Sequence, residues 1–166
     1  MQRLPERVEL VTDKSVFTDD EWRAVSEAPL LISLAMVAAG DHGPISMVKE
    51  ASASARAMTR PGDRGAANDL IAEIAQAAEG KEARHDAGAH RGKSMDEVVS
   101  GALADLQPAA AALGKLPADE TADVGAWLVD IARAVAAASK GTSTAEQETI
   151  DKIAAVFGVA GGPAPS

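Results

Sequence analysis

Apolar residues recur every three or four positions along most of this chain, which is the spacing of helices that bury one face. The pattern is clearest over residues 117–139, where Val124, Leu128, Ile131 and Val135 form one stripe. Runs of β-branched and aromatic residues, which favour strands, are scarce. The spacing therefore predicts an all-α chain with helices over 19–28, 29–39, 46–58, 67–78, 95–106, 108–113, 117–139 and 143–158.

Polar residues mark three of the predicted helix starts. Thr18 and Glu21 have the spacing of a capping box, in which each side chain binds the backbone amide of the other residue. Ser143 and Glu146 repeat that spacing, and Ser94 directly precedes another apolar segment as a predicted N-cap.

Two prolines are predicted to divide apolar segments into separate helices. Proline has no amide hydrogen and disfavours α geometry in the residue before it. We therefore expect one helix to end before Pro29 and another before Pro108. Residues 29–39, which follow the first proline, are apolar nearly all round and are predicted to form the buried central helix.

The same pattern predicts a single domain over residues 18–158. Residues 1–17 mix charges without clear periodicity and are predicted to form an N-terminal arm. Residues 79–94 contain no large apolar side chain and are predicted to form a mobile loop. Residues 159–166 are rich in Gly and Pro and are predicted to be a disordered tail.

Composition narrows the class of protein. Of 166 residues, 46% are hydrophobic but only 2% are aromatic, so alanine-rich helices are expected to pack closely. A net charge of −9 opposes binding to nucleic acid or an anionic membrane. The absence of cysteine excludes disulfides and thiolate chemistry.

The start lacks an apolar signal region, and residues 29–40 are too short to span a bilayer, so we expect a cytoplasmic protein without membrane insertion.

Two similar turns stand out against this background. Residues 36–51, MVAAGDHGPISMVKEA, and residues 135–150, VAAASKGTSTAEQETI, each pass from an alanine-rich stretch through glycine into a helix start. Glycine is suited to the left-handed conformation that ends many helices. The two segments therefore predict two helical hairpins that pack together.

This pattern resembles the TerB-like helical family of tellurite-resistance proteins, and the GPISMVKEASASARAM stretch also resembles a group of small uncharacterised bacterial proteins. The residues that carry the family resemblance are Trp22, Pro29, Ala38, Ala39, Gly40, Asp41, Gly43, Ile45, Ser46, Glu50, Ala136, Gly141, Thr142, Ser143 and Glu146. The resemblance covers mainly residues 18–58 and 125–158. It implies a bacterial, stress-linked protein with an orthogonal bundle of about seven helices and divalent metal bound by clustered acids.

The family resemblance directs attention to Asp41, His42 and Glu50 as ligands of one divalent cation. A hard cation such as calcium prefers six or more oxygen ligands, which three groups do not supply. At the second turn, Lys140 stands where an acid is expected and would repel a cation. The alternative is that Asp41 and His42 fix the end of a helix and Glu50 is solvated.

Three other features have a functional and a structural interpretation. His85, Asp86 and His90 could bind zinc, or they could belong to a solvated loop because no further ligand pair accompanies them. The GAHRGKS segment at 88–94 resembles a phosphate-binding loop but lacks its spacing and a preceding strand, so a helix cap at Ser94 is the alternative. Trp127 could anchor a partner or lie in the core.

No nucleophile, base and orienting residue occur in a recognisable arrangement, which favours a non-enzymatic protein. We therefore expect an interaction or scaffold protein that binds an unknown protein partner, or a second copy of itself, through a helical face or the 79–94 loop. Two alternatives remain, a divalent-metal-binding TerB-like domain and a small-molecule binder or enzyme with a pocket between helices.

Overall fold

The structure, a computed structural model, describes residues 14–40, 68–79, 94–138 and 143–159. These residues form a short 3-10 helix and five α-helices, with no strand among them, so the all-α prediction is confirmed. The predicted helix over 46–58 lies outside the described residues. The elements are η1 (Lys14–Val16), α1 (Asp19–Ala39), α3 (Asn68–Ala78), α5 (Met95–Leu113), α6 (Ala118–Ala138) and α7 (Thr144–Val156).

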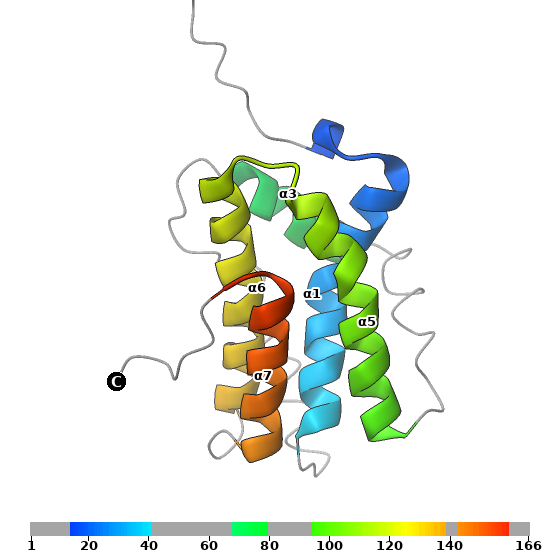
Figure 1. The fold of residues 1–166 in the computed structure, drawn as a ribbon, viewed down its shortest axis with the longest axis vertical. Helices are drawn as coiled ribbons and strands as arrows, with labels where there is room; N and C mark the ends of the chain where they lie inside the picture. The colour runs from blue at the N-terminus through cyan, green and yellow to red at the C-terminus, as the bar shows by residue number, and fades with distance from the viewer. Residues whose placement is uncertain (1–13, 41–67, 80–93, 139–142, 160–166) are drawn as a thin grey trace, which may run out of the picture.

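Helix α1 is the centre of the described fold and contacts each of the other four α-helices. Figure 1 shows it between α5 on one side and α6 and α7 on the other, with α3 crossing one end. Its most extensive packing is against α5. The buried residues of α1 are Val25, Ser26, Ala28, Pro29, Leu31, Ile32, Ala35, Met36 and Ala38. The prediction of a buried central helix after Pro29 is therefore confirmed.

The prediction that the two prolines separate helices is wrong. Helix α1 runs through Pro29, and α5 runs through Pro108. Each proline removes one helical hydrogen bond, at a cost of about 3 kcal/mol. Ile32 on α1 and Leu106 on α5 are fully buried, and burial of such a side chain contributes roughly 1.5–3 kcal/mol. Several such residues on each helix outweigh one lost hydrogen bond, so tertiary packing overrides the local signal.

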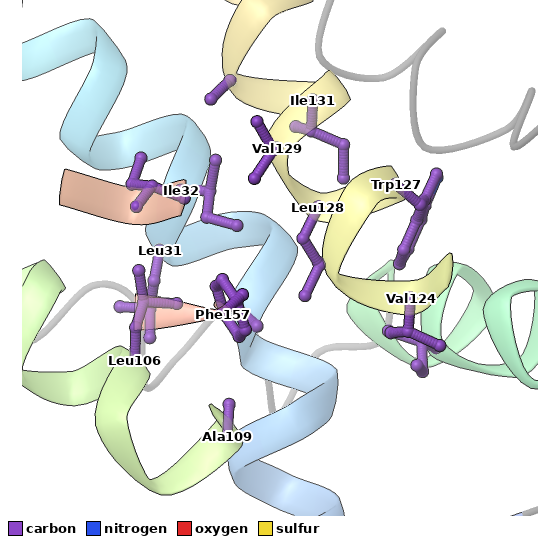
Figure 2. Packing of buried hydrophobic residues seen from close by; sticks show 14 of the residues in the cluster. Leu31, Ile32, Leu106, Ala109, Val124, Trp127, Leu128, Val129, Ile131 and Phe157 are labelled. Atoms are coloured by element: carbon purple, nitrogen blue, oxygen red, sulfur yellow. The ribbon is translucent and has the colours of Figure 1, made fainter. Parts of the chain in front are cut away.

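The core forms where the helical spacing places apolar residues on one face. All four residues of the predicted α6 stripe have no exposed surface. Figure 2 shows Leu31 of α1, Leu106 of α5 and Phe157, which directly follows α7, gathered in one part of this core. Other residues that the spacing places inward are also buried, namely Leu70, Ile71, Ile74, Val98, Ala102, Ile150, Ile153 and Ala154. The same spacing also places Met95 inward, but this side chain is 61% exposed because it lies in the first turn of α5, beyond the packed face of that helix.

The described chain begins with residues that join the core. Phe17 is buried, and its ring stacks on Trp22 with a centroid separation of 6.1 Å. The backbone amide of Lys14 donates to a carboxylate oxygen of Glu73 on α3 at 3.1 Å. Residues 14–17 of the predicted arm therefore pack against the helical body, and the rest of that arm lies outside the described residues.

The end of α7 is closed by a left-handed glycine. Gly158 has a φ of 66°, and its amide donates to the carbonyl of Ala155 at 3.3 Å. The amide of Val159 donates back to Ala154 at 2.9 Å, which completes a Schellman motif. A Cβ on Gly125 of α6 would lie 3.1 Å from Val159, so this glycine gives the turn room to pack on α6.

Replacing Gly158 by alanine is expected to lower the free energy of unfolding by about 1 kcal/mol, because a side chain disfavours positive φ. Urea denaturation measures the change. Gly158→Asn is the matched control and should lose less, since asparagine adopts the left-handed conformation more readily. Equal stability of Gly158→Ala and the unmodified protein would contradict the assigned motif.

Candidate functional site

The residues predicted to bind metal lie outside the described part of the chain. Asp41, His42 and Glu50 fall within residues 41–67, and His85 and His90 fall within residues 80–93, as does Asp86. The metal hypotheses therefore stay predictions. Among the residues that the structure describes, no three His, Cys, Asp or Glu side chains are placed to hold a metal ion.

Two of the structural alternatives can be checked in the described residues. The Ser94 hydroxyl accepts a hydrogen bond from the Glu97 amide, and the Glu97 carboxylate accepts one from the Ser94 amide, each at 3.2 Å. Ser94 thus caps α5, as predicted. Trp127 is 1% exposed and lies in the core, which confirms the structural interpretation of that residue.

The clearest polar cluster joins the start of α1 to the turn between α5 and α6. One carboxylate oxygen of Glu21 accepts from the Thr18 amide at 2.8 Å and from the Lys115 ammonium at 2.6 Å. The Thr18 hydroxyl in turn accepts from the Glu21 amide at 3.3 Å. The capping box was predicted, but Lys115 was not, because no local pattern connects residues 94 positions apart.

The turn that carries Lys115 is itself fastened by a hydroxyl group. The Thr121 side chain lies 2.8 Å from the carbonyl oxygen of Leu113 and 3.1 Å from that of Pro117. Leu116 is buried beside them. Because these contacts connect the end of α5 to the start of α6, they hold Lys115 in reach of Glu21.

The cluster changes the acidity of its carboxyl group. The hydrogen bond from Lys115 is the largest cause that holds the pKa of Glu21 below its ordinary value, and the Thr18 amide adds to it. Both donors favour the ionised carboxylate. The contacts of the Glu21 carboxylate with Lys115 and Thr18 therefore stabilise the fold more strongly when Glu21 is charged.

Replacing Lys115 by methionine is expected to lower the free energy of unfolding at neutral pH. A carboxyl whose pKa is lower in the folded state stabilises the protein above its ordinary pKa, and this contribution is lost as pH falls through the folded-state value. The difference between Lys115→Met and the unmodified protein should therefore shrink on acidification, as urea denaturation at several pH values would measure. Lys152→Met, at an exposed position of α7, is the control. An effect of Lys115→Met that does not depend on pH would contradict the assigned role.

The outer face of α6 carries three acids at helical spacing. Asp119 is exposed, and Asp123 and Asp130 are half-buried. Their separations of four and seven residues place them along one side of the helix. We call Asp119, Asp123 and Asp130 the α6 acidic stripe. Asp130 also forms an ion pair with Arg133 at 3.5 Å. Between the first two acids, Glu120 is 8% exposed, and one of its carboxylate oxygens has no hydrogen-bond partner.

The stripe belongs to a wider excess of acids on the described helices. The described ranges contain seventeen Asp and Glu residues against five Lys and Arg. All of these acids except Glu120 and Glu146 are exposed or half-buried. The surface of the helical body is therefore more acidic than the net charge of the whole chain indicates.

Comparison with known proteins does not assign this arrangement to a family: no family model matches the chain, and no curated protein or solved structure matches it at a significant level.

The metal hypothesis has a direct test in the intact protein. If Asp41, His42 and Glu50 bind a divalent cation, millimolar calcium or magnesium should raise the melting temperature, because a ligand that binds only the folded state stabilises it. Asp41→Ala should abolish the rise, and His85→Ala should retain it. An unchanged melting temperature of the unmodified protein would remove the hypothesis.

Proposed function

We propose that this protein is a non-enzymatic interaction or scaffold protein of the bacterial cytoplasm, and that it binds a positively charged surface of a partner protein. The observation that carries the proposal is the acidic excess of the described helices, seventeen acids against five bases. Such a surface attracts cationic partners and raises their association rate.

The α6 acidic stripe is the surface that we assign to this contact. The opposite side of α6 is fixed in the core by Val124 and Leu128, neither of which has exposed surface. Ala122 is exposed and Ala126 is half-buried, so small side chains lie beside the acids. A lysine or arginine of a partner could approach the carboxylates closely there.

The position of α1 supports a protein that acts in solution. By length and composition alone, this 21-residue helix could cross a membrane, since it continues through Pro29. Half of its most apolar stretch is nevertheless buried inside the protein, and all four other described α-helices contact it. We therefore propose that its apolar surface serves the core rather than a bilayer.

The finer family assignment is part of the same proposal. A TerB-like orthogonal bundle of about seven helices, and a link to stress response, are supported by the two glycine turns in the sequence. Gly40 directly follows α1, but its φ of −77° and ψ of 164° are extended, so this glycine does not adopt the left-handed conformation predicted for the first turn.

The proposed contact can be tested by changing charge on one helix at a time. The probe is a lysine-rich helical peptide, and its binding is measured by fluorescence anisotropy at low and high salt. We expect Asp119→Asn/Asp123→Asn to weaken binding by about tenfold, because close charge pairs across an interface often contribute more than 1 kcal/mol. Salt should weaken the binding of the unmodified protein.

A matched variant separates the stripe from net charge. Glu148→Gln/Asp151→Asn removes the same charge from the exposed face of α7 and should change peptide affinity much less. Melting curves show whether each variant remains folded. Equal weakening by both variants, or no binding by the unmodified protein, would contradict the proposed surface.

A further inference from the structure

Helix α1 concentrates three helix-bending features in eight residues. The Ser26 hydroxyl donates to the carbonyl of Arg23 at 3.0 Å, and the Ser33 hydroxyl donates to the carbonyl of Pro29 at 2.9 Å. Hydroxyls that bind the preceding turn compete with backbone bonds and bend helices. Pro29 adds the loss of the amide that would otherwise donate to Val25. Residues 26–33 are therefore the weakest part of the backbone ladder in α1.

Helix α5 has its own proline at the same level of the bundle. Figure 1 shows α1 and α5 running in opposite directions, and the Glu21–Lys115 ion pair fixes their alignment. Pro29 lies eight residues after Glu21, and Pro108 lies seven residues before Lys115. At about 1.5 Å per helical residue, Pro29 lies roughly 12 Å from Glu21 along α1, and Pro108 lies roughly 7.5 Å from Leu113, the last residue of α5, with Lys115 in the turn that follows. The two prolines therefore lie within about one helical turn of each other in height.

We propose that the paired prolines form a hinge across α1 and α5. Each proline leaves one carbonyl, of Val25 in α1 and of Ala104 in α5, without its helical donor, so opening there costs less than elsewhere in the two helices. The ion pair between Glu21 and Lys115 ties the two segments above the hinge together. The end of the bundle that holds η1, α3 and the α5–α6 turn then bends as one unit relative to the rest.

Hydrogen–deuterium exchange of the full chain tests this hinge through the coupling between the helices. Pro108 is exposed, and Pro108→Ala restores the missing amide without changing the core. We expect exchange over residues 105–112 to slow by about tenfold and exchange over residues 26–33 to slow by about threefold. If the two prolines only bend their helices and do not open together, Pro108→Ala should slow exchange in α5 alone.

Ser100→Ala is the matched control, because it raises helix propensity at another exposed position of α5. It should leave exchange over residues 26–33 unchanged. The comparison uses only amides that exchange through local opening, which exchange faster than global unfolding permits. Urea denaturation gives the free energy of unfolding that sets this limit. The hinge is overturned if Pro108→Ala leaves residues 26–33 unchanged, or if Ser100→Ala slows them equally.

Discussion

Burial of α1 on several sides is the constraint on which the rest of the described structure depends. Residues 29–39, the second half of α1, are apolar nearly all round, and such a segment is stable in water only when other helices cover it. Helices α3, α5, α6 and α7 all contact α1, and each directs its own apolar face toward the same core. Their polar faces then form the surface, which explains why the acids of the described chain collect there.

The alanine-rich composition determines how this core is filled. Ala35 of α1, Ala102 and Ala109 of α5 and Ala132 of α6 have no exposed surface, and such small side chains allow helices to approach closely. Larger groups, such as Trp127 and Met36, fill the remaining volume. Because little of the core is aromatic, its stability comes from many small apolar contacts.

Much of the fold could be predicted from local sequence, because periodicity and capping act over a few residues. The inward stripe of α6 and the caps at Thr18, Ser94 and Ser143 are in place. The continuity of α1 through Pro29 could not be predicted, since it depends on packing that the local sequence does not reveal. The Glu21–Lys115 contact escaped prediction for the same reason, because it joins distant residues. The metal-ligand hypothesis at Asp41, His42 and Glu50 lies outside the described residues and stays a prediction.

The central position of α1 has a consequence for synthesis on the ribosome. It is the first of the described α-helices to be made, whereas α7 ends about 120 residues later. At roughly 5–20 residues per second, α1 waits on the order of 6–24 s before all of its packing partners exist. During that interval its apolar surface is open to chaperones and to other nascent chains, so the helix that organises the finished protein is also exposed to aggregation while the chain is being made.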